Sequence, residues 1–161
     1  MTHEATLPLA YVETTIPSFY YTARRGVESV ARREWTRRWW SVASSSVTLV
    51  TSKAVVFEIA RAPMPLASRA SELLEPVPLL DEPDAVAEIV AAYIRHLVMP
   101  ASPTGDALHL AIASFHGCRF LVTWNCKHLA NANKFDHISR VNTMLGLSTP
   151  HLVTPLELLG E

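Results

Sequence analysis

A chain of 161 residues is long enough to bury a core and short enough to form one domain, so we predict a single domain over residues 1–161. Its composition, 49% hydrophobic and 18% charged, excludes a disordered chain, and its net charge of −1 excludes a global positive field for nucleic acid. No apolar stretch approaches the roughly 20 residues of a transmembrane helix, and the N-terminus lacks a signal-peptide pattern. We therefore expect a cytoplasmic protein without a membrane partner.

Cys118 and Cys126 are too few for a disulfide framework or a zinc site, and we expect both to be reduced, with Cys118 near the core.

Short apolar runs alternate with amphipathic segments along the chain, and this alternation predicts strands and helices in turn. We expect residues 1–7 to be a loose tail and a loop through Pro17 to follow the first strand. Ser52 and Thr104 are placed to cap helices, and Gly146 to end one. In chain order the predicted elements are a strand at 9–13, a helix at 24–43, a strand at 47–51, helices at 53–60 and 66–74, a strand at 77–80, a helix at 81–97, a helix through 107–115, a strand at 120–124, a helix at 135–145 and a strand at 151–154. Such alternation is typical of a parallel sheet covered on both faces.

The first long helix combines an apolar stripe with a basic face. At i, i+4 spacing the stripe is expected to face the core, and it contains Val27, Ala31, Trp35, Trp39 and Val42. Six of the chain's fourteen basic residues also lie in this helix, at Arg24, Arg25, Arg32, Arg33, Arg37 and Arg38.

Three carboxylates and one amide stand where predicted strands end or helices begin. Glu13 ends the first strand and Asn125 follows the fourth, while Glu58 and Asp106 lie on the helices at 53–60 and 107–115 or just ahead of them. Because ligands bind beyond the carboxyl ends of strands in open α/β sheets, we expect these groups to converge. Two carboxylates about 5 Å apart repel by on the order of 3 kcal/mol at an effective dielectric of about 20. A cation such as Mg²⁺ or Mn²⁺, which prefers oxygen ligands, is therefore expected among them.

Four segments, in this order, resemble segments of the PIN-domain family. They are YVETTIPSF at 11–19, VVFEIAR at 55–61, GDALHLAIA at 105–113 and LVTWNCKHL at 121–129. The resemblance covers the chain from about Ala10 to Leu159. It implies a three-layer α/β/α sandwich with a parallel sheet of about five strands. It also implies a metal-dependent ribonuclease, and for a small chain a VapC-type toxin held in check by an antitoxin.

The resemblance assigns roles to individual residues. Glu13, Glu58 and Asp106 match the family's acidic positions and would hold Mg²⁺ or Mn²⁺, and Asn125 occupies the fourth position. These four are the predicted catalytic residues. Thr14 and Thr123 match neighbouring hydroxyl positions that orient ligands, waters or substrate. Two departures are present: the first acidic position is more often Asp, and the fourth is often acidic, so that Asn125 leaves the site with only three formal negative charges.

The implied reaction is hydrolysis of an RNA phosphodiester bond. In this mechanism Glu13 and Asp106 bind the metal, Glu58 binds it or orients its water, and Asn125 holds a water or a phosphate oxygen. One alternative is a catalytically weak PIN-like module that binds RNA or a protein partner. Another is an unrelated phosphoacceptor receiver, which needs an acidic pair beside the first strand; Glu13 stands without such a pair.

Several nearby residues have two open interpretations. His109 shares the helix face of Asp106, so it is either a metal ligand or a histidine of the core that supports the site. Lys127 either contacts a substrate phosphate or is a plain surface lysine. Arg61, one turn beyond Glu58, either binds substrate or pairs with a site carboxylate.

Trp40 falls opposite the apolar stripe of the first long helix, near Arg33 and Arg37. These three residues form either a solvated basic face with one incidental aromatic or a contact surface, because Trp and Arg are enriched at interface hot spots. The partner would be RNA, an antitoxin segment or a second copy of the chain. We expect a homodimer.

Overall fold

A single parallel sheet forms the centre of the computed structural model, which describes residues 5–101 and 105–160. Its strand order is β3-β2-β1-β4-β5. The strands are β1 (Leu9–Val12), β2 (Thr48–Ser52), β3 (Leu79–Leu80), β4 (Phe120–Val122) and β5 (His151–Val153). Central β1 pairs with both β2 and β4, and Tyr11 is in register with Val50 on one side and Leu121 on the other. The predicted parallel sheet of five strands is confirmed.

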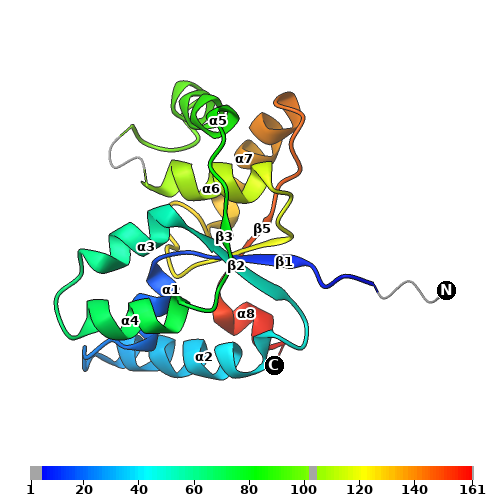
Figure 1. Ribbon diagram of the computed structural model, residues 1–161. Helices are drawn as coiled ribbons and strands as arrows, with labels where there is room; N and C mark the ends of the chain where they lie inside the picture. The colour runs from blue at the N-terminus through cyan, green and yellow to red at the C-terminus, as the bar shows by residue number, and fades with distance from the viewer. Residues whose placement is uncertain (1–4, 102–104, 161) are drawn as a thin grey trace.

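Eight helices in the described residues complete the fold. They are α1 (Thr15–Tyr20), α2 (Val27–Ala43), α3 (Lys53–Ala60), α4 (Leu66–Leu74), α5 (Asp84–Arg95), α6 (Gly105–Phe115), α7 (Ala132–Met144) and α8 (Pro155–Leu159). In Figure 1, α5, α6 and α7 lie above the sheet, α1, α2, α4 and α8 lie below it, and α3 continues from the carboxyl end of β2. This is the predicted three-layer α/β/α sandwich.

The segment after β1 differs from the prediction. Instead of a loop through Pro17, Thr15–Tyr20 form α1, whose first turn is fixed by Glu13: its carboxylate accepts a hydrogen bond from the Thr15 amide at 3.0 Å. Pro17 is compatible with a first turn because the amides there need no partner within the helix. The long helix consequently begins at Val27, not at residue 24.

The buried face of α2 also differs from the predicted stripe. Val27 and Val42 are 90% and 53% exposed, whereas Thr36, Trp39 and Ala43 are buried. The reason is a buried hydrogen bond: Trp124 Nε1 donates to Thr36 Oγ1 at 2.8 Å. A polar residue therefore sits in the middle of the packed face, where hydrophobic spacing does not place it.

Other boundaries shift by a few residues. The third strand contracts to Leu79–Leu80, α5 ends at Arg95, and α7 begins at Ala132 behind the side-chain cap of Asn131. Ser52 caps α3 as predicted, accepting from the Val55 amide, while Thr104 lies outside the described residues. The unpredicted α8 begins at a capping box formed by Thr154 and Glu157. Of the predicted tail, residues 5–7 are exposed and carry no regular structure, and residues 1–4 lie outside the described residues.

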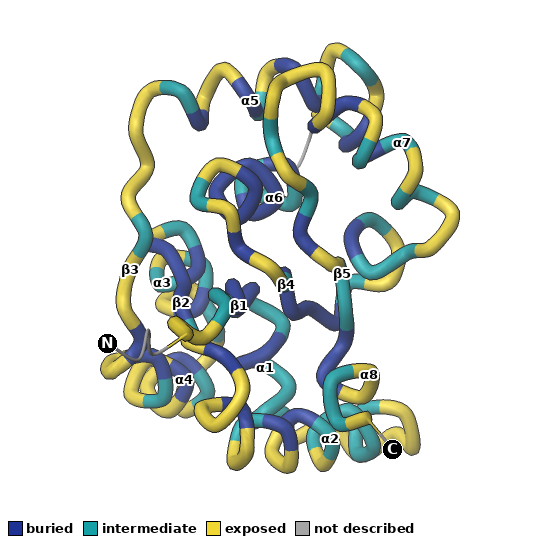
Figure 2. The backbone as a smooth tube through the Cα atoms, turned by 90° about the vertical axis from the view of Figure 1, so that its right-hand side faces the viewer, coloured by how far each residue is buried: buried dark blue, intermediate teal, exposed yellow. Residues whose placement is uncertain are grey.

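The core lies where β1, β4 and α6 meet, and Figure 2 shows dark-blue segments of these elements gathered near the centre of the molecule. Tyr11, Leu110 and Leu121 are fully buried there. Both cysteines are free thiols and Cys118 is buried, as predicted, while Cys126 is exposed. Within the described residues, no helix combines the length and apolar character that a membrane span requires.

Candidate metal centre

The candidate site lies at the point where the strand order reverses. The chain passes from β1 to β2 on one side of the sheet and later returns to β4 on the other side of β1. Glu13 follows β1 directly, and Thr123 follows β4 directly. Open α/β sheets bind ligands beyond such strand ends, so the topology places polar side chains where a ligand is expected.

Glu13 is held by one oxygen and presents the other. The residue is only 4% exposed, and its Oε2 accepts from Thr15 Oγ1 at 2.5 Å, the Thr15 amide at 3.0 Å and Thr123 Oγ1 at 2.8 Å. Burial raises the pKa of Glu13, although His109 and these hydrogen bonds oppose the rise. Among the described residues, no hydrogen bond involves its Oε1. Oε1 is therefore the oxygen available to a ligand.

Glu58 is fixed by a chain of hydrogen bonds that begins in the core. His109 Nε2 lies 3.0 Å from Glu58 Oε1, His109 Nδ1 lies 2.7 Å from the Tyr11 hydroxyl, and that hydroxyl lies 2.7 Å from Ser52 Oγ. Thr14 Oγ1 donates to the other oxygen, Glu58 Oε2. We call Ser52, Tyr11, His109, Glu58 and Thr14 the Tyr11 network. Both Glu58 oxygens are thus oriented by residues from three other elements.

The electrostatics of Glu58 and His109 favour an ion pair between them. Burial alone would raise the pKa of Glu58, but the hydrogen bond and charge of His109, with smaller effects of Thr14 and Arg61, lower it. Burial alone would lower the pKa of His109, but the bond to Glu58 and the negative charges of Glu13, Glu58 and Asp106 raise it. When His109 is protonated, its charge offsets part of the carboxylate repulsion within the site.

Ligand atoms of Glu13, Glu58 and His109 lie within 4.8 Å of one another. Two carboxylates with a free oxygen on Glu13 suit a hard divalent cation, while both ring nitrogens of His109 already lie within hydrogen-bond distance of Tyr11 and Glu58. His109 was one of the open alternatives in the sequence, and the structure places it inside the group. The sequence feature that pointed to His109 was its three-residue spacing from Asp106 on an otherwise apolar helix.

Asp106 lies beside this group but outside it. It is partly buried in the first turn of α6, and its charge contributes to the raised pKa of His109. Gly105 explains how closely α6 approaches: a Cβ there would lie 3.1 Å from Glu58 Oε1. The amino end of α6, with its partial positive charge, thus lies next to the Glu58 carboxylate.

Asn125 holds a turn. Its Oδ1 accepts from the His128 amide at 3.1 Å, and its own amide donates to Thr123 Oγ1 at 2.9 Å. Thr123 and Thr14 each donate to a carboxylate of the cluster, and their predicted role in orienting ligands, waters or substrate stays a prediction. The side chains of Lys127 and Arg61 are exposed, and Arg61 contributes to the lowered pKa of Glu58.

The basic residues near Trp40 contact α1 and the segment that follows it. Arg37 Nε donates to Tyr20 O at 2.8 Å and its guanidinium lies over the Tyr20 ring, while Arg33 donates to Thr22 O at 3.4 Å. Trp40 is partly buried, with its ring edge-on to Tyr20. All three side chains therefore have roles within the chain, and their contact with a partner stays a prediction.

The fold and the site define an α/β/α protein with an acidic and histidine cluster at the switch point of its sheet. Neither a scan against protein-family models nor a search of curated proteins found a match to the chain. The resemblance to the PIN-domain family therefore stays a prediction from the four sequence segments.

Proposed function

We propose that this chain is a metal-dependent ribonuclease of the PIN-domain type, which hydrolyses RNA phosphodiester bonds. The observation that carries the proposal is the convergence of Glu13 and Glu58. They come from elements 45 positions apart in the sequence, yet their ligand atoms and that of His109 lie within 4.8 Å of one another. An acidic cluster at a switch point, on a fold of this topology, supports a cation-assisted reaction more than a structural role.

The residues fit Mg²⁺ or Mn²⁺. Glu13 Oε1 and a Glu58 oxygen would hold the cation, and Asp106, which borders the group, would complete the acidic set. When bound, the cation supplies a water of lowered pKa and offsets charge on the phosphate. Thr15 and Thr123 keep Glu13 oriented, and His109 and Thr14 keep Glu58 oriented. Lys127 and Arg61, both exposed near the site, are the proposed phosphate contacts.

The test is the initial rate of cleavage of a structured RNA across a Mg²⁺ and Mn²⁺ titration. Glu13→Gln removes the charge and keeps the shape, so cleavage should fall by on the order of 10²-fold or more. Asp136→Asn, on the exposed surface of α7, is the matched control and should cleave like the wild type. Equal cleavage by the wild type and Glu13→Gln would rule out this site as the source of the activity.

We also propose, from the resemblance, that the chain is the toxin of a toxin–antitoxin pair, acting in the cytoplasm as a homodimer. A small DNA-binding protein encoded directly upstream, whose co-expression relieves growth arrest, is the expected partner. Growth that is unaffected by the wild-type chain, and equal to growth with Glu13→Gln, would contradict the toxin assignment.

A second candidate function is favoured by Asn125. Its oxygen is occupied by the His128 amide, so the fourth family position contributes neither a charge nor, in this arrangement, a free oxygen. The alternative is a PIN-like module that binds RNA or a protein partner and cleaves weakly. RNA binding without cation-dependent cleavage would favour it.

A further inference from the structure

A pocket of about 700 Å³ opens beside the candidate site, between the end of α1 and the start of α4. We call it the α1–α4 pocket. Its volume is within the roughly 300–1,000 Å³ that is usual for ligand sites. One wall consists of residues 18–19 and 21–24, and the other of residues 63–66 with Arg69.

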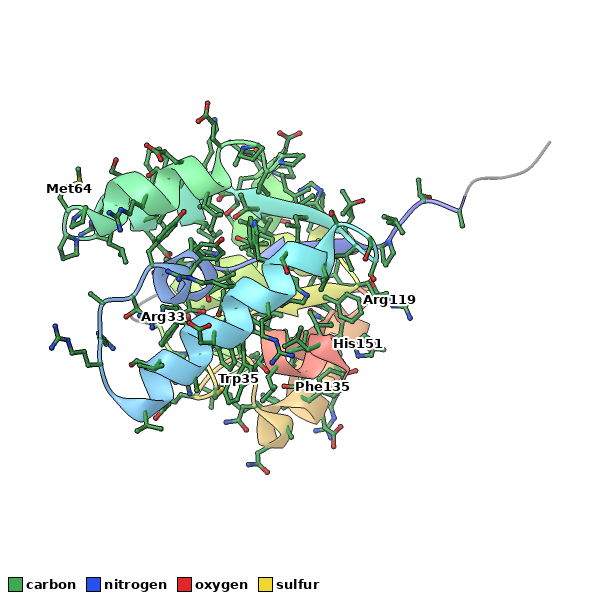
Figure 3. All side chains as sticks on the ribbon, turned by 90° about the horizontal axis from the view of Figure 1, so that it is seen from below. Arg33, Trp35, Met64, Arg119, Phe135 and His151 are labelled. Carbon is green, nitrogen blue, oxygen red and sulfur yellow. The ribbon has the colours of Figure 1, made fainter. Side chains whose placement is uncertain are left out.

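Both walls begin at the candidate site. Thr14, which donates to Glu58, stands at the amino end of α1, and Ser18 in the pocket wall donates to the Thr14 carbonyl at 2.9 Å. The opposite wall starts at Pro63, five residues after Glu58. A six-residue helix spans about 9 Å, so the pocket is roughly one helix length from the carboxylates. Figure 3 shows Met64 of this wall at the end of the molecule opposite Arg119 and His151, which mark the amino ends of β4 and β5.

The charge of the pocket is positive. Arg24 and Arg69 line it, and no acidic side chain does. Within the part of the chain that the structure describes, neither guanidinium has a hydrogen bond or an ion pair. Arg32 and Arg37, by contrast, are engaged with Glu28 and Tyr20. In a chain of net charge −1, two exposed and uncompensated arginines beside an acidic site suit an anionic ligand that reaches both.

Apart from the two arginines and the hydroxyl residues Ser18 and Thr22, the pocket lining is apolar and aromatic. Phe19, Tyr21 and Leu66 line it, and Met64 is 73% exposed at its rim. Apolar and aromatic surfaces of this kind stack unpaired bases, while arginines bind the phosphates that join them. A base paired in a duplex cannot enter a concave pocket, whereas a base in a loop or single strand can.

We infer that the α1–α4 pocket binds unpaired nucleotides of single-stranded RNA adjacent to the phosphodiester at the carboxylates, an inference that rests on the proposed function. Arg24 and Arg69 contact the phosphates, and the Tyr21–Met64 side of the pocket contacts a base. An acidic, apolar peptide would satisfy the same charges. The shared walls favour RNA, because a strand that lies at Glu13 and Glu58 and extends along α1 from Thr14 reaches Ser18 in the pocket wall.

The test measures binding without cleavage. Fluorescence anisotropy with a labelled uridine decamer in EDTA reports affinity independently of any nuclease reaction. The double variant Arg24→Ala/Arg69→Ala should weaken binding by about tenfold or more. It should also reduce the slope of log K against log salt concentration by about 1.4, the change expected when two phosphate contacts on a single strand are lost. The control Arg95→Ala/Arg140→Ala, which removes the same charge from α5 and α7, should change that slope less and leave affinity near the wild-type value.

A second pair of variants tests the apolar surface. Met64→Glu adds a charge at an exposed residue of the pocket and should weaken binding about tenfold, whereas Met144→Glu, 65% exposed on α7, should not. The wild type should also prefer the decamer over an abasic decamer, because each stacked base contributes on the order of tenfold.

The outcomes separate this inference from the proposed function. Cleavage that depends on Glu13, together with unchanged decamer binding by the Arg24/Arg69 and Met64 variants, overturns the pocket and leaves the nuclease standing. Binding that depends on the pocket, without cleavage in any cation, supports the pocket and overturns the nuclease. Arg24- and Arg69-dependent binding of a Glu- and Leu-rich peptide, with no binding of the decamer, makes the pocket a protein-binding site and overturns the inference.

Discussion

Two buried tyrosine hydroxyls organise two hydrogen-bond networks in this fold, and α6 contributes to both of them. Near one end of α6, His109 belongs to the Tyr11 network. Near the other end, Ser114 belongs to the Tyr93 network, which also contains Asn142 and Thr149: the Tyr93 hydroxyl donates to Asn142 Oδ1 at 2.5 Å, and Asn142 Nδ2 donates to Ser114 at 3.1 Å and to Thr149 at 3.2 Å. Tyr11 and Tyr93 are both fully buried.

The difference lies in charge and in where each network ends. The Tyr93 network is neutral and joins α5, α6 and α7, and burial raises the pKa of Tyr93 to about 12. The Tyr11 network ends at Glu58, whose side chain is 38% exposed at the carboxyl edge of the sheet. A neutral, closed network fixes the packing of helices. A network that ends at a partly exposed carboxylate instead fixes the geometry of a group that can bind a ligand. This contrast between the two networks can be tested by mutation.

The largest expected contrast is between Glu58→Gln and Asn142→Ala. Glu58→Gln removes the charge that the Tyr11 network orients, so RNA cleavage should fall by on the order of 10²-fold. Asn142→Ala removes the shorter of the two hydrogen bonds of the Tyr93 hydroxyl, the other being to Ser114 Oγ at 3.2 Å, and also the bonds from Asn142 to Ser114 and Thr149. It should lower the free energy of unfolding by about 1–3 kcal/mol, with cleavage per folded molecule unchanged. Urea unfolding and initial rates measure the two effects. Loss of cleavage in Asn142→Ala at full folding would remove the distinction between the networks.

The matched pair Tyr11→Phe and Tyr93→Phe isolates the hydroxyl groups. Each substitution removes one buried hydroxyl from its partners, so each should cost about 1–3 kcal/mol of unfolding free energy. Only Tyr11→Phe should also slow cleavage, by about 10- to 100-fold, because groups that orient the residues of a metal site typically have effects of this size. If both variants cleave at the same rate, His109 does not need Tyr11 to hold Glu58.

The gain in melting temperature on adding a cation should be lost when the candidate site is altered and kept when the Tyr93 network is altered. Mn²⁺ at a hundredfold excess over its dissociation constant should stabilise the wild type by about 2.7 kcal/mol, and Tyr93→Phe by the same increment from a lower starting point. In Asp106→Asn the increment should vanish, although this variant is expected to melt higher than the wild type in EDTA because it relieves carboxylate repulsion. A wild-type melting temperature that millimolar Mn²⁺ does not change would argue strongly against a metal centre.

The smallest contrast concerns the two asparagines. Unlike Asn142, Asn125 is partly exposed and accepts from the His128 amide. Asn125→Ala should cost about 1 kcal/mol through that lost bond and should cleave more slowly, while Asn125→Asp keeps the acceptor, adds a charge and should tighten Mn²⁺ binding. Calorimetry and initial rates measure both. Equal cleavage by the wild type and Asn125→Ala would exclude Asn125 from the site, and cleavage by Asn125→Asp alone would favour the binding module.

Local patterns predicted most of the fold. Short apolar runs located all five strands, and Ser52 located the start of α3. Helix α1 was missed because its first turn is held by Glu13 and because a six-residue helix containing Pro17 has no clear period. The packed face of α2 was misjudged because Thr36 is buried through a hydrogen bond to Trp124, a residue 88 positions away.

The same limit applies to the site. Glu13 and Glu58 were predictable because strand ends and helix starts can be located by pattern and the topology brings them together. Tyr11 and Ser52 were not, because the sequence indicates an ordinary strand residue at Tyr11 and a helix cap at Ser52. Their role in the site follows only from the contact of the Tyr11 hydroxyl with His109, 98 positions along the chain, and with Ser52. Spacing on one helix linked His109 to Asp106, and only the packing of α6 against α3 showed that the carboxylate it contacts is Glu58.

The strand order has a consequence for protein synthesis. Because β1 lies between β2 and β4, one of its edges stays unpaired until β4 has been translated, and Thr123, which holds Glu13, is 110 positions later in the chain. At roughly 5–20 residues per second, that interval is on the order of ten seconds. Glu13 lacks its cross-strand partner throughout this interval, so a nascent chain cannot assemble the complete centre before the ribosome has passed β4, and truncation before this point leaves an open strand edge that is prone to aggregation.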